Sequence, residues 1–335
     1  MKSDSILIMM ATYNGEEFLR EQLDSILCQT ISTWKLLIRD DNSSDQTRAI
    51  IKEYEEKDSR IQLIENTSKY HGAYYNFFGL LNDVRQSEST FNFYMFADQD
   101  DIWDVDKLER LIDFYYEKVK TEEPVLIYAD MRIIDASGQV TADSMDQLMG
   151  IRYNNPISTF MAHKVYGCNT LFNRELFEIC PLLSYDAPEF AFLSHDNFTA
   201  KTAALKGQVY FYSKPTMGYR RYGHNVTSKH EYNFAFKRIL KRISKIDDLA
   251  KDHALTYKQT LATIHLLRKQ VSSESEQKLL DQVEAIIQRG GFYGVKKVWS
   301  EKIDWGKPVK TLSRTVILFS KLYKKYMRNN EKEDK

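Results

Sequence analysis

The chain has 335 residues, a length that suits about two domains. Its formal net charge is zero, and 43% of its residues are hydrophobic. Residues 1–230 hold 34 acidic and 24 basic side chains, whereas residues 231–335 hold 13 and 23. The acidic first part argues against nucleic acid as a partner, and the basic last part suits anionic phospholipid or a phosphorylated acceptor. The chain contains no apolar window of 18 residues, so we do not expect an integral membrane protein, and its three unpaired cysteines predict a reducing, cytoplasmic setting.

The first 130 residues alternate between two patterns. Continuous apolar runs predict buried strands, and apolar residues three and four positions apart predict helices. The strands are expected at 6–13, 34–40, 60–66, 91–97 and 124–130, and the helices at 15–29, 45–57, 73–84 and 106–119. This alternation predicts an α/β fold with a mostly parallel sheet that helices cover on both faces.

The remaining pattern is less regular up to residue 230 and wholly helical after it. A hairpin turn is expected at Ser137-Gly138, followed by strands at 167–173, 208–212 and 217–223, a helix at 194–205, and then helices at 233–244, 247–271, 274–289 and 309–328. We therefore expect one domain over 1–230 and a helical domain over 231–335. The last helix mixes apolar and basic residues, which fits either an interfacial helix on anionic lipid or a packing helix with a solvated basic face.

Polar clusters follow three of the predicted strands: TYNG, DDNSSD and DQDD. Ligands of parallel sheets bind outside the carboxyl ends of the strands, so a site is expected there. The third cluster contains Asp98, Asp100 and Asp101, whose like charges repel unless a cation lies among them. Asp101 or Asp104 could cap the next helix, but a cap needs one acid, so the cluster favours a divalent-cation site.

Other sites of α/β proteins are not indicated. A dinucleotide site would need GxGxxG after the first strand, and a P-loop would need GxxxxGK[ST]; the chain has neither. A haloacid-dehalogenase-type phosphatase would carry its Asp-x-Asp on the first strand rather than the fourth.

Five segments carry a family resemblance: ATYNGEEFLREQLDSILCQT, RDDNSSDQT, FADQDDIW, GCNTLFNREL and SHDNF. Their order and spacing resemble family 2 inverting glycosyltransferases with the GT-A fold, and more narrowly the rhamnosyltransferases of bacterial cell-wall and capsular polysaccharide. The resemblance covers about residues 5–230 and implies a GT-A domain with an α-helical C-terminal extension. The helical region itself carries no matching motif.

The resemblance also implies a nucleotide-sugar site. Asp40 would accept the N–H of the pyrimidine ring, and Mn²⁺ or Mg²⁺ would bind Asp98 and Asp100, with His224 as a third ligand or an exposed loop residue. Asp196 would be the catalytic base, or else the N-cap of the helix that follows it. The residues expected to bind the donor nucleotide are Thr12, Tyr13, Asn14, Glu16, Asp40, Asp41, Lys69, Asn76, Asp98 and Gln99, and those expected in the acceptor and sugar pocket are Trp103, Cys168, Asn169 and His195.

Several of these residues have a simpler interpretation. Asn76 could be an ordinary helix residue, Lys69 a solvated surface lysine, Cys168 a small buried residue and His195 a structural histidine. Arg220 and Arg221 could either contact the diphosphate or only decorate a strand.

The function expected from the resemblance is transfer of L-rhamnose from dTDP-β-L-rhamnose to a lipid-linked glycan, with inversion, by a cytoplasmic enzyme peripheral to the inner face of the membrane. The basic helices are compatible with membrane docking, with a homodimer, or with both. Two alternatives remain: the same fold with a UDP-hexose donor (galactose, glucose or N-acetylglucosamine), and a non-catalytic nucleotide-binding scaffold.

Overall fold

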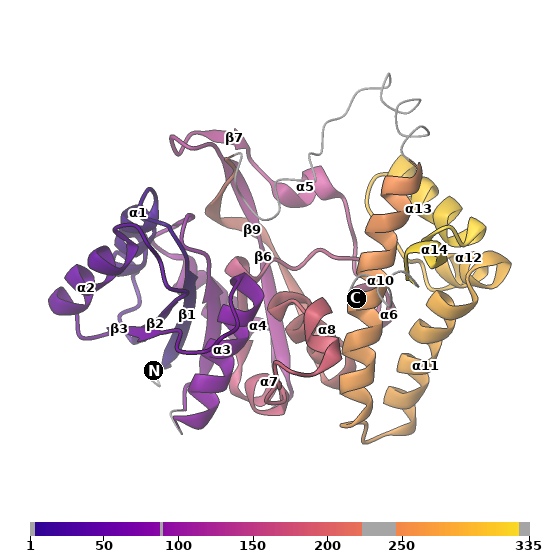
Figure 1. The fold of residues 1–335 in the computed structure, drawn as a ribbon, viewed down its shortest axis with the longest axis horizontal. Coiled ribbons are helices and arrows are strands. Elements are labelled where there is room, and N and C mark those ends of the chain that lie inside the picture. Colours follow the sequence, from indigo (N-terminus) through magenta and orange to yellow (C-terminus); the bar gives the residue numbers. More distant parts are fainter. Residues whose placement is uncertain (1–3, 88–89, 223–245, 328–335) are drawn as a thin grey trace. The chain divides into compact units, whose positions relative to one another are not determined.

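The computed structural model describes residues 4–87, 90–222 and 246–327 (Figure 1). The chain divides into two compact units. The first consists of Met1–Asp146, Val165–Ala187 and His195–Lys229, and the second of Gln147–Lys164, Pro188–Ser194 and His230–Lys335. The domain boundary expected at residue 230 and the helix expected at 233–244 lie outside the described residues.

A nine-stranded sheet forms the centre of the first unit, in the order β3-β2-β1-β4-β8-β6-β9-β5, with β7 paired to β6 (Figure 1). The pairs β1–β2, β1–β4, β2–β3 and β6–β9 are parallel, whereas β8 lies antiparallel between β4 and β6. The predicted α/β fold is thereby confirmed. The strands are β1 (Ile6–Thr12), β2 (Trp34–Asp40), β3 (Ile61–Glu65), β4 (Phe93–Ala97), β5 (Ile102–Trp103), β6 (Val125–Ile134), β7 (Val140–Ala142), β8 (Thr170–Asn173) and β9 (Gln208–Arg220).

One long strand replaces two predicted ones. Separate strands were expected at 208–212 and 217–223, yet β9 runs without interruption through Ser213, Lys214 and Pro215 beside β6. The register between these strands shifts at Ala129 to Arg132, and a proline is tolerated at such an irregularity because its missing N–H breaks no ladder bond there. The hairpin at Ser137-Gly138 is as predicted: β6 and β7 pair around it, and Gly138 has a positive φ of 82°.

Helices of the first unit pack beside this sheet. They are α1 (Leu19–Leu27), α2 (Thr47–Lys57), α3 (Ala73–Gln86), α4 (Lys107–Lys118), α7 (Arg174–Ile179) and α8 (His195–Lys206), with a 3₁₀ turn η1 (Gly167–Asn169), and α5 (Met145–Met149) contains the boundary between the units. Helix α3 packs on β1 and β2, and α8 packs on β6, β9 and α3.

The parallel register brings three strand ends to one edge of the sheet. Thr12 pairs with Asp40, and Met10 pairs with Ala97, directly before Asp98. Most residues of these three strands are buried, and their polar ends lie at this edge. The candidate site is built there.

The second unit is helical. Its elements are α6 (Pro156–Met161), η2 (Pro188–Phe192), α10 (Ile246–Arg268), α11 (Glu274–Arg289), α12 (Gly291–Ser300), α13 (Pro308–Ser320) and α14 (Tyr323–Met327). Ser273 caps α11 by accepting from the Glu276 N–H, and Gly290, with a φ of 53°, ends it. Buried Trp305 donates its indole N–H to the Met161 carbonyl at 2.7 Å. No helix in the described part of the chain is long and apolar enough to cross a membrane.

Candidate active site

The loops after β1 and β2 are tied to each other. The Asn14 side chain accepts from the Ser44 N–H at 2.9 Å, and the Asn14 N–H donates to the Ser43 hydroxyl at 2.9 Å. Glu16 accepts from the Gln46 N–H at 2.8 Å. Asn14 has a φ of 45°, a conformation that Asn tolerates better than most residues. In this structure Asn14 and Glu16 therefore shape the loops.

Asp40 and Asp41 are buried and well supplied with hydrogen-bond donors. Asp40 accepts from the hydroxyls of Thr12 and Ser43, at 3.0 and 2.5 Å, and from the Ser43 N–H at 2.8 Å. Asp41 accepts from the Asn66 amide at 2.6 Å and from the Gly72 N–H at 2.6 Å, and it lies 2.8 Å from the His71 ring. These carboxylates organise the edge of the sheet, and the nucleotide role of Asp40 stays a prediction.

Asn76 and Gln99 connect strand ends. The Asn76 amide donates to the Arg39 carbonyl at 2.7 Å and accepts from the Arg39 guanidinium at 2.9 Å. The Gln99 side chain accepts from the Tyr13 N–H at 2.9 Å and donates to the Tyr13 carbonyl at 3.0 Å. Tyr13 itself is 58% exposed. Because its backbone is fixed, its ring is presented at the edge.

The turn between β4 and β5 carries the three acids and is fixed by Arg220 of β9. This arginine is fully buried; its Nε donates to the Asp100 carbonyl at 2.8 Å, and its backbone N–H donates to Asp101 Oδ1 at 3.1 Å. The guanidinium also binds Glu21 at 2.6 Å. Arg220 thus supports the turn from within the protein, and Asp100 accepts from the Tyr222 hydroxyl at 2.8 Å.

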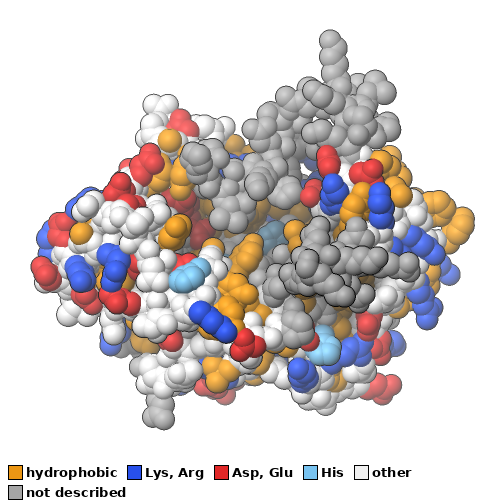
Figure 2. Space-filling view, in the orientation of Figure 1, with side chains coloured by type: hydrophobic (Ala, Val, Ile, Leu, Met, Phe, Trp, Pro, Cys, Tyr) orange, Lys and Arg blue, Asp and Glu red, His pale blue; other side chains and the backbone are white. Residues whose placement is uncertain are grey.

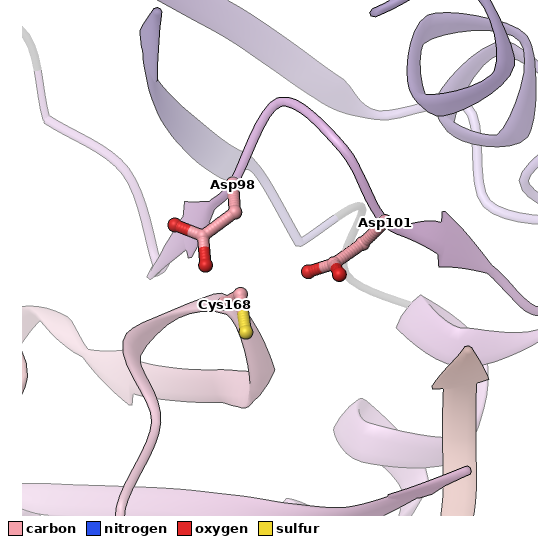
Figure 3. Close-up of side chains that lie close together, drawn as sticks. All are labelled: Asp98, Asp101 and Cys168. Carbon is pink, nitrogen blue, oxygen red and sulfur yellow. The ribbon is translucent and has the colours of Figure 1, made fainter. Parts of the chain in front are cut away.

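Asp98 and Asp101 lie at the two ends of this turn, and Cys168 of η1 lies opposite them (Figure 3). One ligand atom from each of the three lies within 4.8 Å of the others. Asp101 is fully buried, and its Oδ2 accepts no hydrogen bond from the described residues. The cluster therefore differs from the predicted set of Asp98, Asp100 and His224. His224 lies outside the described residues, so the roles of Asp100 and His224 stay predictions.

Burial and mutual repulsion dominate the electrostatics of the cluster. Burial, then Asp100 and, to a smaller extent, Asp196 raise the pKa of Asp98 to about 7. Burial, then Asp100 and Asp98 raise the pKa of Asp101 well above its usual range. The Asp101 Oδ2 lacks a hydrogen-bond donor among the described residues, and burial opposes the ionisation of both carboxylates. Such a group of oxygens suits a cation that prefers oxygen ligands.

The cluster therefore fits a divalent cation. Asp98 and Asp101 offer the hard oxygen ligands that Mg²⁺ and Mn²⁺ prefer. Burial raises the pKa of the Cys168 thiol, so the neutral sulfur is a weaker ligand beside them. The structure does not favour Mn²⁺ over Mg²⁺.

Sequence reasoning missed the buried lysine beneath the cluster. Lys107 of α4 is fully buried, donates to the Cys168 carbonyl at 3.0 Å and lies 3.9 Å from the centre of the Trp103 ring. Burial lowers the pKa of Lys107 to about 7, although Asp101 and Asp98 oppose that shift. The pattern DKLERL only suggested a helix start, and nothing in it distinguishes a buried lysine from a solvated one.

Asp196 lies in the first turn of α8, next to the cluster. Its neighbour Gly167 is so close that a Cβ there would lie 2.4 Å from His195 Nε2 and 3.4 Å from the Asp196 Cβ. Gly167 directly precedes Cys168, so η1 contacts both Asp196 and the cluster. Partial burial, then Asp196 and Asp98 together raise the pKa of Tyr74 to about 12. The predicted base and the predicted metal acid are therefore close enough to affect each other's electrostatics and that of Tyr74.

Several predicted pocket residues are part of the packed interior. His195 is stacked on Phe77 at 3.9 Å between ring centres, which is a structural position. Trp103 is buried, and Asn169 donates to the carbonyls of Ala129 and Asp130, both at 2.9 Å.

Lys69 is 78% exposed and lies 4.0 Å from Asp186. The Arg221 guanidinium lies 3.6 Å from the Met145 sulfur. Binding roles for these residues stay predictions.

An α/β sheet with an acid cluster at the carboxyl end of β4 and a further aspartate nearby is typical of α/β enzymes, whose ligands bind outside the carboxyl ends of the strands. Residues 7–180 match the family Glycosyl transferase family 2. The chain belongs to this family, has the GT-A fold and is a glycosyltransferase.

Individual relatives refine this assignment. The chain is 31% identical over 245 residues to the dTDP-rhamnosyl transferase RfbG of Shigella flexneri, an alignment that covers 71% of this chain and 78% of RfbG. It is 38% identical over 107 residues to the UDP-Glc:alpha-D-GlcNAc-diphosphoundecaprenol beta-1,3-glucosyltransferase WfgD of Escherichia coli, covering 32% of this chain and 39% of WfgD. Residues 1–349 of S. aureus TarS, solved in complex with UDP-GlcNAc, share the fold with a TM-score of 0.51 and 14% identity, over 96% of this chain and 90% of that chain.

Proposed function

We propose that the protein is a metal-dependent inverting rhamnosyltransferase. It would transfer L-rhamnose from dTDP-β-L-rhamnose to a hydroxyl of a lipid-linked glycan in the synthesis of cell-wall or capsular polysaccharide. The observation that carries this proposal is the neighbourhood of Asp98, Asp101 and Asp196 at one end of the sheet. The similarity to RfbG over most of both chains supports rhamnose as the sugar.

The side chains at this edge would have two separate roles, cation binding and proton acceptance. Asp98 and Asp101 would hold a divalent cation beside the donor diphosphate; when bound, it supplies Lewis-acid stabilisation of the leaving nucleotide's charge. Asp196 would accept the proton of the acceptor hydroxyl while that oxygen attacks the anomeric carbon and the bond to the diphosphate breaks. A single displacement of this kind inverts the anomeric centre and gives an α-rhamnosyl product.

The loops after β1 and β2 would receive the nucleotide. Tyr13 presents an exposed ring at this edge, where a base can stack on it. Asp40 and Asp41 keep the loops in place through their own hydrogen bonds. Rigid support of this kind holds reacting groups in position without a further cost of ordering.

A direct assay tests the proposal. Purified protein with dTDP-rhamnose, Mn²⁺ and a lipid-linked saccharide is expected to release dTDP and to form a rhamnosylated lipid. If the donor binds but neither product forms with any lipid-linked saccharide from rhamnose-containing polysaccharides, the proposal is wrong.

A UDP-hexose donor is the second candidate, because WfgD, which is 38% identical over part of this chain, is named for UDP-glucose. Donor choice depends on the few side chains that meet one sugar hydroxyl. Thermal unfolding with dTDP-rhamnose, UDP-glucose, UDP-galactose or UDP-N-acetylglucosamine, each with and without Mn²⁺, separates the candidates, since a bound ligand stabilises by mass action. We expect dTDP-rhamnose with Mn²⁺ to give the largest rise in Tm, and a larger rise with any UDP-sugar would assign the donor to that class.

A further inference from the structure

The helical unit exposes an apolar surface on α12 and α13. On α13, Val309, Leu312, Val316 and Phe319 follow one another at intervals of three and four residues, and they are 44 to 66% exposed. On α12, Phe292 and Trp299 are seven residues apart and are 82 and 76% exposed. Such spacings place each set on one face of its helix. We call these six residues the α12–α13 apolar surface.

The two stripes form one surface. The rings of Phe292 and Phe319 contact each other with 4.9 Å between their centres. The core of the unit uses other side chains of α13, Ile317 and Leu318, which are fully buried, and Leu318 packs on Gly294 of α12. The exposed stripe is therefore not required for packing within the unit, and its exposure in water costs free energy that a partner would recover.

Positive charge predominates in the segment that carries this surface. Residues 289–327 contain ten Lys and Arg but only two acids, Glu301 and Asp304. Lys296 lies on the same face of α12 as Phe292 and Trp299 and is exposed. Figure 2 shows hydrophobic side chains beside Lys and Arg side chains at this part of the helical unit.

We infer that the α12–α13 apolar surface docks on an anionic phospholipid bilayer. Tryptophan and phenylalanine are suited to the boundary between headgroups and acyl chains, and each lysine near an anionic surface adds attraction. A second copy fits less well, because a two-fold dimer through this surface would bring two strongly basic faces together. The inference does not depend on which sugar the enzyme transfers.

Tryptophan fluorescence of the full chain tests the inference. Trp34, Trp103 and Trp305 are at most 3% exposed, so Trp299 is the solvent-exposed tryptophan among the four. Vesicles of phosphatidylglycerol and phosphatidylcholine should shift its emission to shorter wavelength and protect it from acrylamide. Vesicles of phosphatidylcholine alone should do so much less. The Trp299→Phe variant should show neither change.

A matched pair of variants tests the surface itself by co-sedimentation with the anionic vesicles. Leu312 of the surface is 66% exposed, and Leu182 of the first unit is 55% exposed. Leu312→Ser should weaken vesicle binding roughly tenfold, because one buried aliphatic side chain is lost from the lipid. Leu182→Ser should bind like the unmodified protein. Lys296→Glu should weaken binding to anionic vesicles and leave the weak binding to neutral vesicles unchanged.

Two results would overturn the inference. One is equal vesicle binding by Leu312→Ser and Leu182→Ser, both folded by circular dichroism. The other is self-association in analytical ultracentrifugation that Leu312→Ser abolishes, which would assign the surface to a second copy of the chain.

Discussion

The acids after β2 and the acids after β4 lie at the same edge of the sheet, yet Asp41 and Asp101 differ in how fully their carboxylates are hydrogen-bonded. Asp41 is buried and accepts from the Asn66 amide and the Gly72 N–H. Asp101 is equally buried, but its Oδ2 accepts no hydrogen bond from the described residues, and burial raises its pKa. A buried carboxylate that is fully hydrogen-bonded stabilises the fold, whereas one that is not needs a proton or a cation. We therefore expect Asp41 to stabilise the fold at this edge and Asp101 to bind a cation.

The largest effect is expected at Asp196, the proposed catalytic base. Asp196→Asn removes the proposed base, and kcat should fall roughly 10²–10⁴-fold, about 3 to 5.5 kcal/mol of barrier. The dissociation constant for dTDP with Mn²⁺, measured by calorimetry, should stay within about twofold. Normal turnover by this variant would remove Asp196 from the mechanism.

Substitution of Asp41, by contrast, should lower the stability of the protein. In Asp41→Asn either orientation of the new amide turns its NH₂ group toward a donor, the Asn66 amide or the Gly72 N–H. We expect a loss of about 2 kcal/mol in the free energy of unfolding, because a buried donor is left without its acceptor. Urea unfolding measures it, and an unchanged midpoint would mean that these hydrogen bonds are not needed.

The same substitution at Asp101 should act in the opposite direction. Asp101→Asn removes a carboxylate whose ionisation burial opposes, so the metal-free protein should be as stable as the parent or more stable. Its affinity for Mn²⁺ should fall at least tenfold, about 1.4 kcal/mol, as measured by electron paramagnetic resonance titration. A marked loss of stability together with unchanged Mn²⁺ affinity would mean that Asp101 stabilises the fold and does not bind the cation.

A smaller effect is expected in the pH dependence of stability near Asp196. Lys201 is buried, and burial lowers its pKa to about 7, which Asp196 opposes. Between pH 7 and about 10 the unfolded chain binds this proton and the folded chain does not, so the contribution of Lys201 to stability rises with pH. The free energy of unfolding in urea, measured at pH 7, 8 and 9, should rise with pH more steeply in the unmodified protein than in Lys201→Met. The difference between the two slopes should be up to about 1.4 kcal/mol per pH unit. Equal slopes would mean that Lys201 titrates alike in both states.

Much of the fold could be predicted, because hydrophobic periodicity reports burial directly. The parallel strands β1 to β4 and the long helices follow from it. The antiparallel insertion of β8 could not be predicted, since nothing local specifies which strands become neighbours. Strand β5 has two residues, and α12 begins at Gly291 directly after Gly290, so neither leaves a clear periodic signal.

The sequence indicated which side chains gather at this edge of the sheet but not which of them are buried. The order of the motifs indicated that Asp98 and Asp196 belong together, and the structure places them close. Which acid of the turn is buried depends on Arg220, more than a hundred residues away, whose N–H binds Asp101 and whose guanidinium binds the Asp100 carbonyl. Pairings over such distances are set by tertiary packing, so a local pattern of acids cannot distinguish Asp100 from Asp101.

The most direct test of the central claim is a crystal structure with dTDP and Mn²⁺, examined by anomalous scattering. The account predicts one Mn²⁺ peak bonded to Asp98 and Asp101 and to the diphosphate, with the Asp196 carboxylate facing the place of the sugar. A diphosphate bound away from the turn after β4, or an Asp196 that points away from it, would contradict the account.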